Sequence, residues 1–125
     1  MRVTPEDVLA EWLAAAELDL QVAERITDAP TAAAFHLQEA AEKALKAFIL
    51  RQKIKPPRTH DISQLRNLAG PSLAWTTDPT ILARLTMWNA AFRYPDMNPV
   101  DAPTEAQVVE TIEQVRSLLD EFRQS

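Results

Sequence analysis

The sequence predicts an all-α protein, a single-domain antiparallel bundle of four long helices and one short helix. Apolar residues recur at spacings of three and four, and prolines separate these helical segments. The 125 residues contain one glycine and nine prolines, which counts against a β-sandwich rich in glycine turns. Because no strand pattern, repeat or linker interrupts the chain, we expect one domain over residues 1–125.

The first helix is expected to begin after Thr4 and to end near Thr27, ahead of Pro30. Thr4 can cap the helix, and Pro5 suits its first position. The apolar face of this helix comprises Leu9, Trp12, Leu13, Ala16, Leu20 and Ala23.

The second helix is expected over Pro30–Lys53, because Pro56 and Pro57 then force a break. Apolar residues lie on more than one side of it, so it should touch two neighbours or a second subunit. Packing of its alanines inside the chain and a dimer seam are equally open explanations. The main stripe is Leu37, Ala41, Ala44, Leu45 and Phe48, with Phe35, Ala40, Ala47 and Ile49 partly off it.

Three further helices complete the predicted bundle. A short one runs from about His60 to Ala69, capped by Thr59, and a loop follows over 71–78. The fourth begins at Asp78-Pro79 and ends near Tyr94, before a proline-rich loop over 95–103. In the fifth, Thr104 opens a capping box with Gln107. Its apolar residues are Val108, Ile112, Val115, Leu119 and Phe122.

Charge is distributed unevenly along the chain. The net charge is −5, which argues against a generic nucleic-acid binder. Residues 43–66, however, carry seven basic residues and one acid, a local charge of +6. This basic segment suits an RNA-phosphate site or an acidic partner, and a solvated helix end with a basic loop is the alternative.

Composition excludes several kinds of chemistry. Without cysteine there are no disulfides, thiol nucleophiles or cysteine metal sites, and the scarcity of glycine excludes phosphate-cradling loops. His36 and Glu39 alone are too few ligands, so we expect no metal and no other cofactor. No apolar run is long enough to span a membrane, and acidic residues interrupt any N-terminal signal sequence. We therefore expect a cytoplasmic protein without membrane contact.

Two short segments carry candidate binding chemistry. In residues 58–61 (RTHD), Arg58 and His60 suit a phosphate, although a capped helix start explains the same residues. In residues 93–98 (RYPDMN), Arg93 suits a phosphate or the final carbonyls of its helix.

These residues together resemble the HEPN (higher eukaryotes and prokaryotes nucleotide-binding) domain family. Residues 35–47 (FHLQEAAEKALKA) look like the family's central helix, and residues 58–62 (RTHDI) look like its next helix start. Residues 91–95 (AFRYP) look like a third marker, and Trp12, Ala16 and Asp19-Leu20 also fit. The resemblance implies a cytoplasmic homodimeric helical bundle, often paired with a minimal nucleotidyltransferase, sometimes as a toxin–antitoxin module.

The resemblance also implies a metal-independent RNase site, an arginine followed after four to six residues by a histidine. Arg93 matches the arginine, but Asn98 occupies the histidine position and no histidine follows His60. Asparagine cannot act as a general acid or base near pH 7. We therefore favour a degenerate RNase motif and no catalysis.

Three hypotheses follow for the function. The first is a dimer that binds a nucleotide, RNA or a nucleotidyltransferase partner. The second is an RNase toxin whose catalytic residues are Arg93, Asn98 and His60. The third is a structural dimerisation module in which Arg93 only closes its helix end. The candidate nucleotide- or RNA-binding residues are Lys43, Lys46, Arg58, His60, Arg93 and Tyr94.

Overall fold

The computed structural model describes residues 4–70, 79–93 and 102–124, and their backbone forms helices and no strand. The all-α prediction is therefore confirmed, with four long helices and one short helix in the described part of the chain. The helices are α1 (Pro5–Arg25), α2 (Pro30–Arg51), α3 (Ile62–Ala69), α4 (Pro79–Arg93) and α5 (Glu105–Gln124).

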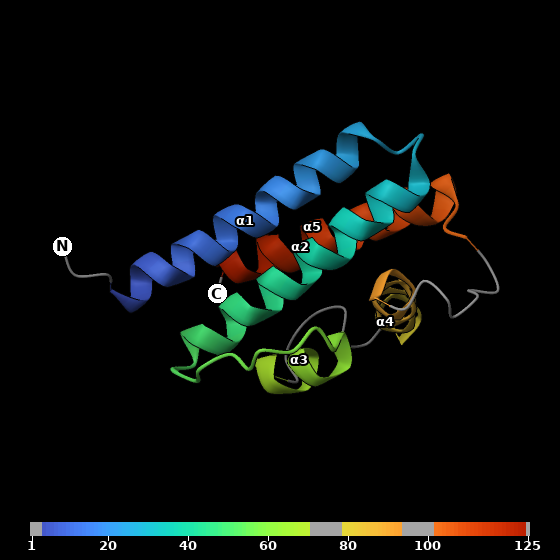
Figure 1. Cartoon of the computed structure of the whole chain (residues 1–125). Coiled ribbons are helices and arrows are strands. Elements are labelled where there is room, and N and C mark those ends of the chain that lie inside the picture. The colour runs from blue at the N-terminus through green and yellow to red at the C-terminus, as the bar shows by residue number, and fades with distance from the viewer. Residues whose placement is uncertain (1–3, 71–78, 94–101, 125) are drawn as a thin grey trace.

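The central element is α2, which contacts every other helix. In Figure 1, α1 and α2 run antiparallel side by side and α5 lies behind them, whereas α4 is seen almost end-on. The short α3 lies beside the C-terminal half of α2 and also contacts α4. The three helices α2, α3 and α4 therefore contact one another pairwise.

Side-chain caps fix the starts of the terminal helices. Thr4 caps α1, and its Oγ1 accepts a hydrogen bond from the Asp7 amide at 3.1 Å while Asp7 accepts one from the Thr4 amide. Thr104 and Gln107 form the same reciprocal pair at α5, as predicted. The predicted caps are therefore confirmed at both ends; the Asp78 cap lies outside the described residues.

The end of α2 is set by its backbone before the two prolines are reached. The helix ends at Arg51 rather than Lys53, because Lys53 adopts a left-handed φ of 64°. The Lys53 amide bonds to the Leu50 carbonyl at 2.8 Å and the Ile54 amide to the Ile49 carbonyl at 3.4 Å. This pattern is a Schellman motif, in which a left-handed residue closes the last turn.

The start of α3 differs from the prediction. The helix begins at Ile62 rather than His60, and its cap is Asp61 rather than Thr59. Asp61 Oδ1 accepts from the Gln64 amide at 3.1 Å, whereas Thr59 Oγ1 accepts from the Asp61 amide at 3.2 Å. Thr59 therefore shapes the turn ahead of the cap, and His60 stays outside the helix.

The alanines of α2 are covered within the chain itself. Ala40, Ala41, Ala44 and Ala47 have no exposed surface, and Leu37, Leu45 and Ile49 are equally buried. Small side chains let the four neighbouring helices approach α2 closely. This burial favours packing inside the chain over a dimer seam as the explanation for these alanines.

Ion pairs join the two terminal helices on the outside of the bundle. Arg116 of α5 donates from Nη1 to both oxygens of Glu17 at 2.7 and 2.9 Å, and from Nη2 to Glu24 at 2.8 Å. Arg123 approaches Glu17 at 3.4 Å. Within the described residues, no helix combines the length and the apolar character needed to cross a membrane.

Candidate functional site

A pocket of about 430 Å³ opens where the segment before α3 meets α4. Arg58, Thr59, His60 and Asp61 contribute one side, and Thr86, Asn89 and Ala90 of α4 contribute the other. This binding candidate, here called the His60 pocket, contains two of the residues singled out from the sequence. Arg58 is exposed and has no hydrogen bond or ion pair among the described residues.

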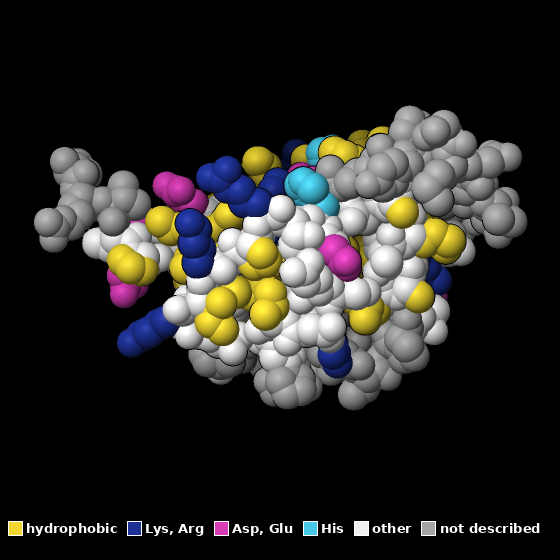
Figure 2. Space-filling model, turned by 60° about the horizontal axis from the view of Figure 1, so that its bottom comes forward, with side chains coloured by type: hydrophobic (Ala, Val, Ile, Leu, Met, Phe, Trp, Pro, Cys, Tyr) yellow, Lys and Arg dark blue, Asp and Glu magenta, His cyan; other side chains and the backbone are white. Residues whose placement is uncertain are grey.

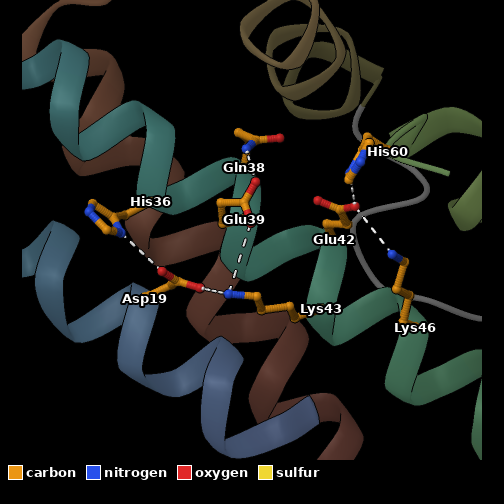
Figure 3. A network of polar contacts seen from close by, with 8 residues as sticks. All are labelled: Asp19, His36, Gln38, Glu39, Glu42, Lys43, Lys46 and His60. Carbon is orange, nitrogen blue, oxygen red and sulfur yellow. Dashed lines mark hydrogen bonds and ion pairs between the residues drawn. The ribbon is translucent and has the colours of Figure 1, made fainter. Parts of the chain in front are cut away.

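A buried carboxylate fixes the imidazole of His60. The Nδ1 atom lies 2.6 Å from Oε1 of Glu42, whose side chain is only 4% exposed, whereas that of His60 is 53% exposed. The same Oε1 accepts from Lys46 Nζ at 3.3 Å, and Figure 3 shows Glu42 between His60 and Lys46. An ionised carboxylate only accepts hydrogen bonds, so the contact with Glu42 favours a proton on Nδ1 and leaves Nε2 outside this contact.

Hydrogen bonds between separate elements hold His60 at the pocket between the segment before α3 and α4. The buried side chain of Asn89 donates from Nδ2 to the His60 carbonyl, which ties the segment to α4. Gln52 Nε2 donates to the Ala69 carbonyl at 2.7 Å and so holds the far end of α3 against α2. The Ser63 and Thr86 hydroxyls, 3.3 Å apart, link α3 to α4.

Arg93 is the last residue of α4 and lies one helical turn beyond Asn89 and Ala90. Positions three and four apart share a face of a helix, so Arg93 occupies the register that continues the pocket-lining face. Tyr94 and Asn98, the other predicted residues of this segment, lie outside the described residues.

A second polar cluster joins α1 to α2 and is separate from the His60 pocket. Asp19 accepts from Lys43 Nζ at 2.5 Å and lies 2.9 Å from Nδ1 of His36 (Figure 3). Glu39 lies 3.9 Å from Lys43 and accepts from Gln38 at 2.6 Å. Lys43 therefore neutralises acids between two helices, and its predicted role in nucleotide binding stays a prediction.

Apart from Arg66, which donates to Asn67 Oδ1 at 3.1 Å, the remaining residues of the basic segment divide into two groups. Lys46 is paired with Glu42, and Arg51 donates to the Phe122 carbonyl at 2.9 Å while its guanidinium lies 4.1 Å from the Phe122 ring centre. These two side chains serve packing as well as charge. Lys53, Lys55 and Arg58 are exposed, so the outward positive charge gathers around the segment before α3.

Glu42 and Asn89 hold His60 in place, yet sequence reasoning did not select either of them. A signal existed for both. Glu42 and Lys46 form an i, i+4 pair within an alanine-rich helix, and Asn89 is a lone amide four residues before Arg93. A buried polar residue in such a setting requires a specific partner.

The pocket has the chemistry of an anion site. An unpaired guanidinium, an imidazole and the Thr59 hydroxyl offer donors, and the Asp61 carboxylate is the acid among the lining residues. A guanidinium fork matches two phosphate oxygens. Within residues 4–70, 79–93 and 102–124, no three His, Cys, Asp or Glu side chains gather to hold a metal ion.

The five helices of the described residues have the arrangement of a HEPN-type helical bundle. Residues 9–124 match the sequence profile described as the HEPN domain, and this chain belongs to that family. The recognition made from residues 35–47, 58–62 and 91–95 is thereby confirmed.

Two solved structures share this architecture. The chain is similar to ST0689, an archaeal HEPN homologue, with 30% identity and a TM-score of 0.66 over 92% of this chain and 94% of that one. It also shares the fold of TT1696 from Thermus thermophilus, with 21% identity and a TM-score of 0.68 over 90% of this chain and 93% of that one. No match was found among curated proteins.

Proposed function

We propose that this HEPN protein binds RNA or nucleotides through their phosphate groups at the His60 pocket. The observation that carries the proposal is that one pocket holds both Arg58, which has no partner among the described residues, and a histidine whose ring is held by buried Glu42. Arg58 supplies the bidentate donors that phosphate prefers, and His60 supplies a donor or an acceptor according to its protonation. The positive charge of residues 53–58 attracts an anion to a chain that is acidic overall.

The proposal extends to the assembly in which the protein works. A cytoplasmic homodimer, with a minimal nucleotidyltransferase as partner in a toxin–antitoxin-like module, is the arrangement that family membership supports best. The whole chain, residues 1–125, acts as one domain in this proposal. Co-purification of the tagged protein with its neighbours in the cell tests the partner directly, and repeated recovery of this chain alone would contradict it.

Binding to a fluorescent single-stranded RNA, followed by anisotropy at two salt concentrations, tests the phosphate site. Arg58→Gln and His60→Ala should each weaken binding about tenfold or more, because each removes a hydrogen bond to a charged group. Arg25→Gln removes the same charge from an exposed position at the end of α1 and should change affinity less than twofold. Equal losses in Arg58→Gln and Arg25→Gln would reduce the site to a nonspecific charge effect.

Metal-independent RNA cleavage is the second candidate function, and one geometric feature favours it. With the Glu42 carboxylate on Nδ1, His60 Nε2 remains to accept a proton, and Asn89 ties the His60 carbonyl to α4 one helical turn before the Arg93 position. In this reaction the ribose 2′-hydroxyl gives its proton to Nε2 and attacks the adjacent phosphorus. The bond from phosphorus to the 5′-oxygen then breaks, the 5′-oxygen takes up a proton from water, and a 2′,3′-cyclic phosphate remains.

Incubation of RNA with the purified protein in EDTA separates the two candidates. The binding proposal predicts intact RNA, because Asn98 occupies the position of the family's histidine. Cleavage by the wild type that is lost in both His60→Ala and Arg93→Ala would establish the RNase instead. Retention of cleavage in His60→Ala would indicate a contaminating nuclease.

A further inference from the structure

A second hollow lies beside the His60 pocket, where the first turns of α1 meet the C-terminal end of α2. Its volume is about 420 Å³. Apolar side chains form its walls and three cations lie among them, and none of the described residues that line it is acidic. The lining residues are Val8, Trp12, Lys46, Leu50, Lys55, Pro56, Pro57 and Arg58. This hollow is called the Trp12 pocket below.

The two pockets adjoin at Arg58, which lines both. Lys46 forms a second link: it lines the Trp12 pocket and also pairs with Glu42, the carboxylate that holds His60. Figure 2 shows Lys and Arg side chains gathered beside a histidine, with hydrophobic side chains next to them. A ligand whose phosphate contacts Arg58 can therefore place an apolar group in the adjacent Trp12 pocket.

The composition of the Trp12 pocket selects one kind of occupant. A small inorganic anion would gain no binding energy from walls of tryptophan and proline. A neutral apolar ligand would gain none from the charges of Lys55 and Arg58. A nucleotide combines a flat apolar base with a charged phosphate and uses both features. Trp12 is half-buried, and Lys46 Nζ lies 5.3 Å from its ring centre.

We propose that the Trp12 pocket receives an unpaired base of single-stranded RNA whose phosphate lies at Arg58 and the His60 pocket. This inference rests on the proposed function and makes it specific for single strands. Bases in a duplex are already stacked and paired, so only an unpaired base can enter such a pocket. Stacking on an aromatic side chain is tolerant of sequence, because every base has a flat face. We therefore expect little preference among the four bases.

The experiment compares a short single-stranded RNA with an abasic oligonucleotide of the same length and charge. Anisotropy with the full chain should show about tenfold tighter binding of the RNA that carries bases. In Trp12→Leu this preference should fall below twofold, while affinity for the abasic strand stays within twofold of wild type. Leu18→Ala, at a 62% exposed position of the same helix, should retain the full preference.

The outcomes separate this inference from the proposal on which it rests. Equal wild-type affinity for the two strands would overturn the base pocket and leave the phosphate site intact. A preference that survives in Trp12→Leu would also overturn it. Failure of both strands to bind would overturn the phosphate site together with the base pocket. The wild-type comparison can overturn the base pocket even if Trp12→Leu proves unstable.

Discussion

His60 depends on a carboxylate that the bundle has taken out of water. Burying a charge is costly unless it is paired and hydrogen-bonded, and Glu42 meets that condition through Lys46 and His60. The imidazole of His60 is therefore exposed to solvent while a buried carboxylate holds its Nδ1 atom. A surface histidine without such a partner would rotate freely and would spend little time facing a ligand.

Removal of this carboxylate tests how strongly the cluster is coupled. Glu42→Gln should lower the free energy of unfolding by about 2–4 kcal/mol, because it leaves the ammonium of Lys46 nearly buried without a counter-charge. Urea unfolding measures the loss, and Glu110→Gln, at an exposed ion pair, should lose less than about 1 kcal/mol. Adding Lys46→Met to Glu42→Gln should recover part of the loss; a fully additive double variant would contradict the pairing.

At the scale of elements, the eight-residue α3 is too short to be stable alone and is held by its cap and by its contacts. Asp61 provides the cap and at the same time lines the His60 pocket. Its carboxylate therefore stabilises the helix that positions His60 and repels the anion that His60 is proposed to bind.

Two substitutions separate these effects of Asp61. Asp61→Ala should cost about 1 kcal/mol of stability, because the Gln64 amide loses its partner. Asp61→Asn keeps a good cap, so stability should hardly change while RNA affinity rises about threefold with one acid removed. Thermal unfolding and anisotropy supply the two readouts. Weaker RNA binding by Asp61→Asn would mean that the carboxylate itself contacts the ligand.

Helix positions were predictable because periodicity and capping are local properties of the chain. Thr4 and Thr104 each begin a capping motif that is complete within four residues, and both capping boxes are present. The end of α2 was missed by two residues, because a left-handed lysine at 53 carries none of the usual glycine signal. Thr59 and Asp61 are both good caps, and only the turn formed by Thr59 shows which one starts α3.

The candidate site was predictable only in part, for a physical reason. Arg58 and His60 are close in the sequence, and both line the same pocket. The contacts of His60 with Glu42 and Asn89 span 18 and 29 residues, and no local pattern encodes such distances. Lys43 and Lys46 looked alike in the sequence, yet Lys43 pairs with Asp19 of α1 and Lys46 pairs with Glu42 of α2 itself.

At the scale of the molecule, an ion pair between Glu17 of α1 and Arg116 of α5 joins the two terminal helices. These two residues are 99 positions apart in the sequence. Burial raises the pKa of Glu17, but hydrogen bonds and charge from Arg116 and Arg123 outweigh it and leave the pKa below its usual 4.5. Stability from this group is therefore present at pH values above 4.5 and is lost as pH falls through the lowered pKa.

A pH series tests this ion-pair cluster. At pH 7, Glu17→Gln should be less stable than wild type by about 1 kcal/mol, a value that allows for solvent screening. The difference should vanish in acid, below the lowered pKa of Glu17, and should shrink at 1 M salt. Glu113→Gln, at an exposed position on α5, should match wild type throughout. A difference between wild type and Glu17→Gln that persists unchanged into acid would show that the effect is not electrostatic.

The central claim is that RNA phosphate binds where the segment before α3 meets α4. The most direct test is amide chemical-shift mapping of the labelled protein titrated with a short single-stranded RNA. The largest shifts should fall at residues 58–61 and 86–90, with a smaller group at the Trp12 indole. Shifts confined to another surface, such as the Asp19–His36 cluster on α1 and α2, would contradict the claim.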